Sequence, residues 1–326
     1  MGKEILKISD LKVVFRTEEG IVKAVDGLDL IVNQGDAVGI VGESGCGKSV
    51  TALSIMRLIP EPPGHVEAES IFFQEKDLTH VTGYEMRQIR GNQISMIFQE
   101  PMTSLNPVFK IGFQISESIR VHLGCSKREA HHRTIELLKL VGIPSPELRV
   151  KDYPHQLSGG MRQRVMIAIA ISCSPKLLIA DEPTTALDVT IQAQILALIR
   201  DLKDKIGTSI IFISHNLGVI AEIVQRVMVM YAGRAVEFTD VFSLFENPCH
   251  PYTAGLMKSI PILKRGPIER RKLYAIPGIV PSLANLPKGC KFSDRCSHAF
   301  LQCYEEEPSL AEVHSGHHVR CWLFRK

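Results

Sequence analysis

Five short apolar runs recur along the chain, separated by longer segments in which helical periodicity appears. The runs span Ala37 to Val41, Ile94 to Phe98, Leu177 to Ala180, Ile210 to Ile213 and Val227 to Tyr231. Short runs rich in β-branched residues are typical of strands that are buried on both faces of a parallel sheet. The pattern therefore predicts an α/β fold.

A long interval separates the second run from the third. Helical periodicity over Ser126 to Val141 and Met161 to Ile171 predicts an inserted helical subdomain at about residues 102–172. Frequent prolines from Asn247 onward disfavour long helices in the last part of the chain. We therefore expect a main domain over residues 1–250 and a small irregular domain over residues 251–326.

Composition excludes several classes of protein. Hydrophobic residues make up 45% of the 326 positions and charged residues 22%, which argues against disorder and fibrous repeats. A net charge of +3 is too small to indicate a general nucleic-acid surface. The charged N-terminus lacks the apolar segment of a signal peptide, and the longest apolar stretch, around Val165 to Cys173, is too short to cross a bilayer. We expect a cytosolic chain that reaches a membrane only through partners.

A phosphate-binding motif follows the first apolar run. Its residues, in the pattern G-x-x-x-x-G-K-S/T with one residue beyond it, are Gly42, Glu43, Ser44, Gly45, Cys46, Gly47, Lys48, Ser49 and Val50. Glycines let backbone N–H groups turn inward toward phosphate oxygens, and the following helix adds partial positive charge. We expect Lys48 to reach the outer phosphates of a nucleoside triphosphate and Ser49 to bind Mg²⁺. The alternative, a glycine-rich turn that binds nothing, leaves the flanking strand and helix unexplained.

Two carboxylates end the third apolar run. Asp181 and Glu182 directly follow Leu177 to Ala180. A strand end of this kind suits Asp181 for the magnesium shell and Glu182 for aligning an attacking water. Two adjacent acids are otherwise only a solvated turn, but the phosphate loop upstream favours the functional interpretation.

A segment before the acidic strand resembles the signature motif of ATP-binding cassette (ABC) ATPases. It runs from Leu157 to Arg164 around Ser158, Gly159 and Gly160, with Met161 where glutamine is commoner. The resemblance covers about residues 5–245, and its other motifs occur in the family's order. They are the adenine-stacking aromatic residue Phe15, the Q-loop residue Gln99, the D-loop Ala186, Leu187 and Asp188, and the switch histidine His215. Each has an alternative on its own, such as a core role for Phe15, but their order favours the family.

The resemblance implies a P-loop nucleoside triphosphatase core with a parallel sheet, an N-terminal antiparallel β subdomain, an inserted helical subdomain and a small irregular cysteine-rich C-terminal domain. It also implies ATP hydrolysis in a head-to-tail dimer, where the phosphate loop of one cassette and the signature motif of another enclose each nucleotide. Glu182 would polarise the attacking water and His215 would contact the γ-phosphate. Gln99 would join Ser49 and Asp181 around Mg²⁺.

Two segments resemble, more narrowly, the ATPase subunits of dipeptide, oligopeptide and nickel permeases. They are Phe98 to Pro107 and Asn247 to Thr253, and such subunits carry a C-terminal extension like residues 251–326. The resemblance implies a second ABC ATPase, commonly a different chain, two transmembrane permeases and an extracytoplasmic peptide-binding protein that delivers the substrate. It places the chain peripherally at the cytoplasmic face of the membrane. The cassette does not touch the solute, so peptide length, or nickel or another small solute instead, is not encoded in it.

The tail carries four cysteines, Cys290, Cys296, Cys303 and Cys321. Their gaps of five, six and seventeen residues are longer than in zinc knuckles or ferredoxin motifs, so spacing leaves a cluster, zinc and four reduced thiols open. The nearby His314, His317 and His318 support zinc. The resemblance favours a [4Fe–4S] cluster, because some peptide-permease ATPases carry a tail like this one. Since the tail lies outside the cassette, we expect a Cys296→Ser change to leave ATP binding intact.

Two other functions compete with that of a peptide-importer motor. A soluble ABC ATPase that acts on nucleic acid or the ribosome usually has two cassettes or a long coiled-coil insertion, whereas this sequence has one cassette and no heptad run. A redox-sensing module built on the cysteines would not need Glu182. We therefore predict a transport ATPase that uses ATP and Mg²⁺ and binds no nucleic acid.

Overall fold

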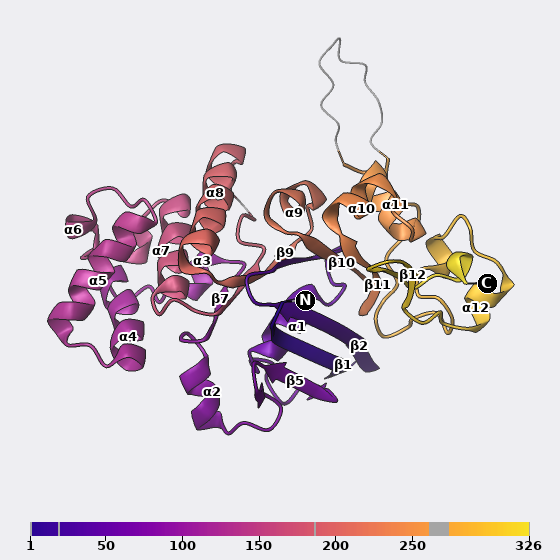
Figure 1. The fold of residues 1–326 in the computed structure, drawn as a ribbon, viewed down its shortest axis with the longest axis horizontal. Helices are drawn as coiled ribbons and strands as arrows, with labels where there is room; N and C mark the ends of the chain where they lie inside the picture. The colour runs from indigo at the N-terminus through magenta and orange to yellow at the C-terminus, as the bar shows by residue number, and fades with distance from the viewer. Residues whose placement is uncertain (1, 19, 186, 261–273, 326) are drawn as a thin grey trace, which may run out of the picture. The chain divides into compact units, whose positions relative to one another are not determined.

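The computed structural model describes residues 2–18, 20–185, 187–260 and 274–325. These residues form two compact units, which can be followed along the ribbon in Figure 1. The first unit consists of Met1–Leu6, Ile31–Ala37 and Phe72–Ile213, and the second of Lys7–Leu30, Val38–Ile71 and Ser214–Lys326. Each unit is thus assembled from segments that are distant in the sequence.

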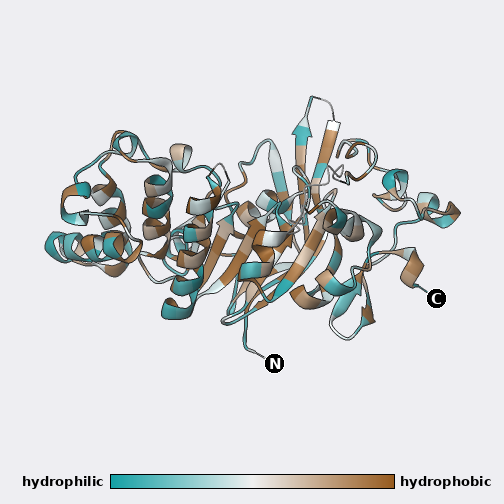
Figure 2. Cartoon of the chain, turned by 90° about the horizontal axis from the view of Figure 1, so that it is seen from above, coloured by the Kyte–Doolittle hydropathy of each residue, from teal (hydrophilic) through white to brown (hydrophobic). Residues whose placement is uncertain are grey.

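Three parallel strands form the sheet of the first unit. β7 (Ile94–Ile97) pairs with β8 (Leu177–Asp181), and β8 pairs with β9 (Ser209–Ser214). Every residue of these strands is buried, and Figure 2 shows the strands largely in the hydrophobic colour. The predicted strands are confirmed to within one residue at each end.

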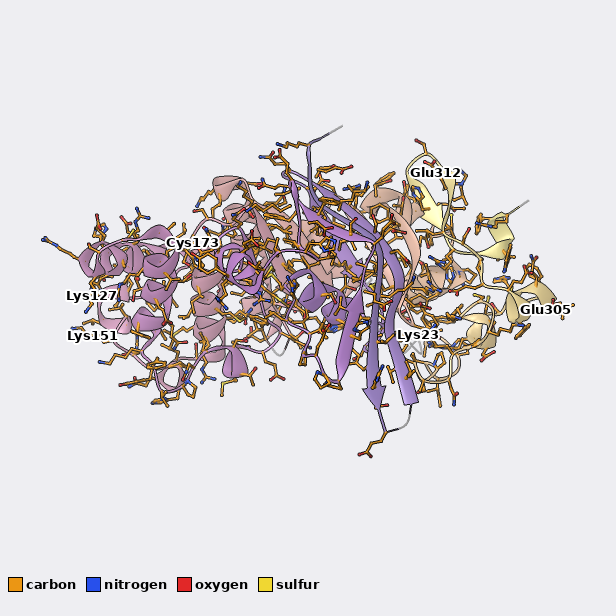
Figure 3. All side chains as sticks on the ribbon, turned by 90° about the horizontal axis from the view of Figure 1, so that it is seen from below. Lys23, Lys127, Lys151, Cys173, Glu305 and Glu312 are labelled. Carbon is orange, nitrogen blue, oxygen red and sulfur yellow. The ribbon has the colours of Figure 1, made fainter. Side chains whose placement is uncertain are left out.

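The predicted helical subdomain lies between β7 and β8 (Figure 1). Its elements are α3 (Pro101–Ser104), α4 (Ile111–Leu123), α5 (Lys127–Leu140), α6 (Pro146–Arg149), the 3-10 turn η1 (Pro154–Gln156) and α7 (Gly159–Ile171). A capping box starts α5, where the Ser126 hydroxyl accepts from the Glu129 N–H and the Glu129 carboxylate accepts from the Ser126 N–H. α4 buries Ile115 and Ile119 on one face. Charged side chains such as Lys127 cover the outside (Figure 3).

The second unit holds the strand that leads into the phosphate loop. β3 (Ala37–Val41) runs parallel to β10 (Arg226–Tyr231), which pairs antiparallel with β11 (Arg234–Asp240). β13 (His317–Val319) pairs with β11, and β12 (Ala311–His314) pairs with β13. Two strands of the C-terminal tail therefore continue the same sheet, which the apolar pattern of the sequence did not predict.

Antiparallel pairing marks the N-terminal region, as expected. This region has two long strands, β1 (Glu4–Thr17) and β2 (Gly20–Asn33). β1 pairs antiparallel with β4 (Gly64–Glu67), in a register that places Phe15 opposite Gly64. β5 (Ser70–Phe73) and β6 (Lys76–Asp77) also pair antiparallel. The remaining elements are α1 (Lys48–Ile55), α2 (Gly83–Ile89), α8 (Val189–Ile206), α9 (Leu217–Ile223), α10 (Val241–Glu246), α11 (Pro251–Lys258), α12 (Leu301–Glu305) and the 3-10 turns η2 (Ser293–Arg295) and η3 (Trp322–Phe324).

Helices in the tail are short, in line with its proline content. After Lys258 the one α-helix among the described residues is α12, which has five residues. Within the described ranges, none of the helices combines the length and the apolar character needed to span a membrane.

Candidate nucleotide site

The phosphate loop joins β3 to α1 as predicted, and its glycines are required by the backbone. Gly42 has φ +154°, and a Cβ at this position would lie 2.2 Å from the carbonyl oxygen of Met230. Gly47 has φ +105°, and its Cβ would lie 2.3 Å from the carbonyl oxygen of Ala24. Because neither backbone oxygen can move aside cheaply, larger residues would displace the loop.

Lys48 directs its ammonium group into the phosphate loop. The side chain Nζ donates to the carbonyl oxygens of Gly42 at 2.8 Å and of Glu43 at 3.0 Å, and only 4% of Lys48 is exposed. Ser49 follows in the first turn of α1. Burial raises the pKa of the Cys46 thiol, so this cysteine is a neutral packing residue of the loop. A cation inside a loop at a helix N-terminus is suited to bind phosphate.

The acidic strand end lies in the first unit, where the structure brings Gln99 and Glu182 together. Gln99 Nε2 donates to Glu182 Oε2 at 3.2 Å. The Thr185 hydroxyl donates to the same oxygen at 2.9 Å, and this threonine was not among the predicted site residues. Glu182 directly follows the buried Asp181. Its backbone has φ 44°, which residues other than glycine rarely adopt. The carboxylate is therefore held in one orientation by two donors.

Phe15 and His215 belong to the second unit. Phe15 is half-buried on β1, next to the fully buried Val13, so part of its ring is accessible for stacking. His215 is exposed and directly follows β9. Its unit also contains Lys48 and Ser49, whereas Gln99, Asp181 and Glu182 belong to the first unit.

Within the first unit, the signature motif starts α7 and the D-loop leads into α8. The Ser158 hydroxyl accepts from the Met161 N–H at 3.4 Å and caps the N-terminus of α7. Asp188 caps α8 by accepting from the Ile191 N–H at 2.9 Å. A Cβ on Gly160 would lie 2.9 Å from Ile191 Cγ2, so this glycine allows the two helices to approach closely. Ala186 of the D-loop lies outside the described residues.

The four tail cysteines line one pocket. Cys290, Cys296, Cys303 and Cys321 share its wall with residues that include His250 and Trp322. Burial raises the pKa of Cys290 and of Cys321 to about 11, so without a bound metal these thiols stay protonated.

One glycine brings two cysteine-bearing segments together. The Cys290 N–H donates to the Cys303 carbonyl oxygen at 2.8 Å. At Gly289, the preceding residue, a Cβ would lie 2.3 Å from that same carbonyl oxygen. Gly289 is therefore needed for the approach, and nothing in the cysteine spacing pointed to it.

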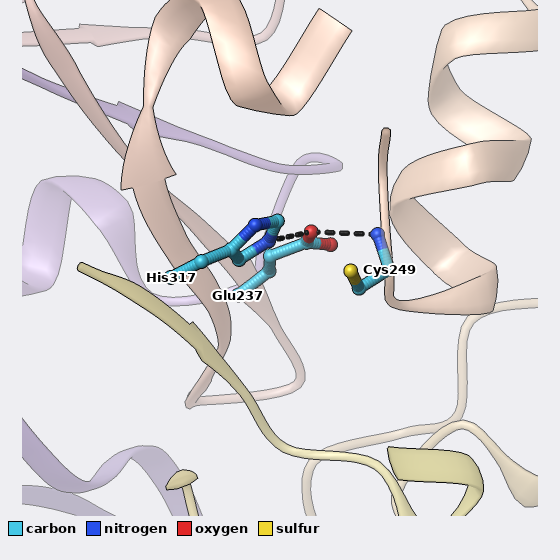
Figure 4. A group of neighbouring side chains, drawn as sticks. All are labelled: Glu237, Cys249 and His317. Carbon is cyan, nitrogen blue, oxygen red and sulfur yellow. Dashed lines mark hydrogen bonds and ion pairs between the residues drawn. The ribbon is translucent and has the colours of Figure 1, made fainter. Parts of the chain in front are cut away.

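A second group of possible metal ligands, Glu237, Cys249 and His317, is buried where the tail strand β13 pairs with β11 (Figure 4). Their ligand atoms all lie within 4.8 Å of one another. Glu237 Oε1 accepts from His317 Nε2 at 2.7 Å and from the Cys249 N–H at 2.8 Å, and Oε2 accepts from the His250 N–H at 2.9 Å. Burial and the nearby carboxylate raise the pKa of Cys249 to about 11. Because three donors already satisfy the carboxylate, the group fastens β13 to β11 without a metal.

Two family models match the chain. The model described as ABC transporter matches residues 25–185, and the one described as oligopeptide/dipeptide transporter, C-terminal region, matches residues 236–303. The chain is 53% identical to the oligopeptide transport ATP-binding protein AppD of Bacillus subtilis, over 99% of this chain and 97% of the relative. It is 48% identical to the dipeptide transport ATP-binding protein DppD of Escherichia coli, over 97% of this chain and 96% of the relative.

A solved structure agrees with these relatives. The dimeric ATP-binding cassette MJ0796, in a post-hydrolysis state bound to ADP and Pi, superimposes with a TM-score of 0.65 and 26% identity. The match covers 72% of this chain and 98% of that cassette. This chain is therefore longer than that cassette, and about a quarter of it lies outside the matched region.

Proposed function

This chain belongs to the ABC ATPases of oligopeptide and dipeptide transporters, and from that membership we propose how its residues perform the family's work. It is the ATP-hydrolysing motor subunit of a peptide importer. The observation that carries the assignment is the cation of Lys48 inside a loop between β3 and α1, joined to both family matches. Nickel or another small solute is the alternative cargo.

The proposed roles follow the chemistry of each group. Lys48 and the N–H groups of the loop hold the phosphates, and Ser49, Gln99 and Asp181 surround Mg²⁺. Glu182, fixed by Gln99 and Thr185, orients the attacking water. We further propose that Phe15 stacks on adenine, that His215 contacts the γ-phosphate, and that the nucleotide of the partner cassette is bound by Ser158, Gly159, Gly160 and Asp188.

Replacing Lys48 with alanine tests the nucleotide site. Lys48→Ala deletes the ammonium group that lies in the loop, so we expect ATP binding to weaken at least about 100-fold, as for the loss of several charge-assisted hydrogen bonds. Binding is measured by calorimetric titration of the purified chain with Mg²⁺ and ATP. Lys127→Ala, on the exposed start of α5, is the matched control. An affinity for ATP that Lys48→Ala leaves unchanged contradicts the assignment.

The implied partners are a second ABC ATPase and two transmembrane permeases, with a peptide-binding protein acting outside the membrane. We propose that the permease docks on exposed apolar side chains after the Q-loop. Val108, Phe109 and Phe113 are 71%, 45% and 44% exposed, and the two phenylalanine rings lie 5.0 Å apart. Exposed apolar clusters of this kind are typical of protein interfaces. Such docking holds the chain at the cytoplasmic face of the membrane.

A Phe113→Asp change tests this docking surface. A charge in place of an interface aromatic residue is expected to weaken binding to the permease subunits at least about tenfold. The measurement is the amount of permease that co-purifies with the tagged chain in detergent. Leu148→Asp changes an equally apolar residue, 70% exposed on α6, and serves as control. Equal recovery of permease with Phe113→Asp and wild type rules out this surface.

We propose that the four tail cysteines hold a [4Fe–4S] cluster, with zinc as the alternative. Their position around one pocket supports a single shared ligand. Tetrahedral zinc brings its sulfur ligands within about 4 Å of one another, given a Zn–S bond of about 2.3 Å. Among the described residues, one group of three possible metal ligands has its ligand atoms within 4.8 Å of one another, namely Glu237, Cys249 and His317. None of the four tail cysteines belongs to this group. The wider spacing suits a cluster better than one ion. When bound, the cluster would cross-link the tail.

The domain division remains part of this proposal. Residues 1–250 form the cassette, with the helical subdomain at about 102–172, and residues 251–326 form the extension that carries the cysteines. The C-terminal family match, over residues 236–303, supports an addition that begins near the end of the cassette.

A further inference from the structure

The C-terminal region holds Glu43, the second residue of the phosphate loop, by its backbone and by its side chain. The Glu43 N–H donates to Tyr252 Oη at 2.8 Å. The Glu43 carboxylate accepts from Arg295 Nη1 at 2.8 Å and from Arg295 Nη2 at 3.1 Å. The Glu43 carbonyl oxygen accepts from Lys48 Nζ at 3.0 Å. Glu43 therefore connects the lysine of the loop to two side chains that are 209 and 252 residues away in the sequence.

The pairing of Arg295 with Glu43 is sheltered and geometrically defined. The Arg295 side chain is 5% exposed and that of Glu43 is 27% exposed, so salt screens this pair less than a surface pair. Arg295 Nη1 also donates to Tyr231 Oη at 3.3 Å, and the guanidinium group lies 5.7 and 5.8 Å from the ring centroids of Tyr231 and Phe292. These contacts keep the guanidinium directed at the loop.

Tyr252 is anchored from its other side. It is fully buried at the start of α11, and its N–H donates to His250 Nδ1 at 3.1 Å. Burial lowers the pKa of His250 to about 3, which keeps this imidazole neutral and able to accept. The His250 N–H in turn donates to Glu237, the carboxylate that binds His317 of β13 in Figure 4. The tail strand and the Tyr252 hydroxyl thus belong to one continuous network.

We propose that Arg295 and Tyr252 are positioning residues that hold the phosphate loop in its nucleotide-binding form, so that the C-terminal tail sets the affinity of the loop for ATP. The proposal rests on the ATP site proposed above. A loop that is already held loses less conformational freedom when phosphate binds, and this preorganisation increases affinity. Arg295 directly precedes Cys296, so the cysteine site and the phosphate loop share an anchoring segment. The expectation that Cys296→Ser leaves ATP binding intact therefore stays a prediction, and a measurement of its ATP affinity bears on this proposal as well.

Two single variants remove the two anchors. Arg295→Met keeps much of the side-chain length but deletes the charged pair, and we expect the dissociation constant for nucleotide to rise about tenfold. Tyr252→Phe removes only the hydroxyl group that accepts from the loop, and we expect a rise of about threefold. Arg295→Lys keeps the charge without the paired donors, so its affinity should lie between those of wild type and Arg295→Met.

The measurement is calorimetric titration of the full-length chain with Mg²⁺ and a non-hydrolysable ATP analogue. Glu43→Gln, alone and combined with Arg295→Met, completes a double-mutant cycle, in which a shared contact makes the two effects non-additive. Arg325→Met is the matched control, because Arg325 is also a tail arginine but contacts Ser309 and Trp322. Thermal unfolding of each variant identifies any that fails to fold.

The outcomes separate this inference from the proposed function. If wild type does not bind the analogue, the ATP site itself is wrong. If wild type binds and Lys48→Ala does not, yet Arg295→Met and Tyr252→Phe bind within about 1.5-fold of wild type, only the positioning role is overturned. Additive effects in the cycle, or an equal loss with Arg325→Met, likewise overturn it. Should Arg295→Met fold poorly, Tyr252→Phe and Glu43→Gln still decide.

Discussion

A chain carrying Glu182→Gln is expected to bind ATP but to hydrolyse it about 10²–10⁴ times more slowly, the range of general-base contributions in enzymes. The amide keeps the shape of the side chain and can still interact with Gln99 and Thr185, which contact Glu182 Oε2. It lacks the negative charge that would draw a proton from the attacking water. The variant should therefore keep its affinity for ATP while its rate of ATP hydrolysis falls.

Phosphate release by the assembled transporter is the appropriate measurement, because in the proposed head-to-tail dimer a second cassette would complete the site. Calorimetry on the same variant reports whether binding survives. Glu136→Gln, at an exposed position of α5, removes a carboxylate remote from the strand end and should leave turnover unchanged. Turnover by Glu182→Gln within about threefold of wild type, far inside the general-base range, would remove this residue from its proposed role.

The parts of the site formed by residues that are close in the sequence could be predicted from local sequence patterns. The run Ala37–Val41 is buried at every position, and the glycines after it match a loop that sterically needs them. A buried parallel strand is a continuous apolar run, and a phosphate loop is a fixed spacing of glycines and lysine. Both properties are visible within about ten residues, which is why the β3–loop–α1 unit could be predicted.

Contacts between residues that are far apart in the sequence could not be predicted from local sequence patterns. Thr185 donates to Glu182, but a threonine near an acid is common in turns and predicts nothing by itself. Arg295 meets Glu43 across 252 residues, and a single arginine in a tail resembles any solvated charge. His317 was considered as a zinc ligand because it lies near Cys321, whereas its Nε2 binds Glu237. These pairings depend on how the tail joins β11, which only the tertiary structure specifies.

Protein purified without oxygen is expected to be brown, with about four irons and four sulfides per chain and little zinc. The four thiols around one pocket form a complete all-cysteine ligand set for such a cluster. Burial raises the pKa values of Cys290, Cys296 and Cys321, so cluster binding must displace protons from these thiols, and assembly should be less complete at low pH. Iron and sulfide are measured chemically, and broad visible absorption reports the intact cluster.

Cys296→Ser should lose the iron and the colour and should lower the melting temperature of the tail, because one of four ligands is gone. Its effect on ATP affinity has an upper bound, since the tail reaches the phosphate loop through Arg295 and Tyr252: the loss should not exceed that of Arg295→Met combined with Tyr252→Phe. Ser309→Ala, outside the pocket, should keep both iron and affinity. If wild-type protein purified without oxygen is colourless and holds one zinc per chain, the cysteines bind zinc and the cluster assignment is wrong. A Cys296→Ser chain that loses iron but loses ATP binding as completely as Lys48→Ala would mean that the cluster supports the cassette by a route other than these two side chains.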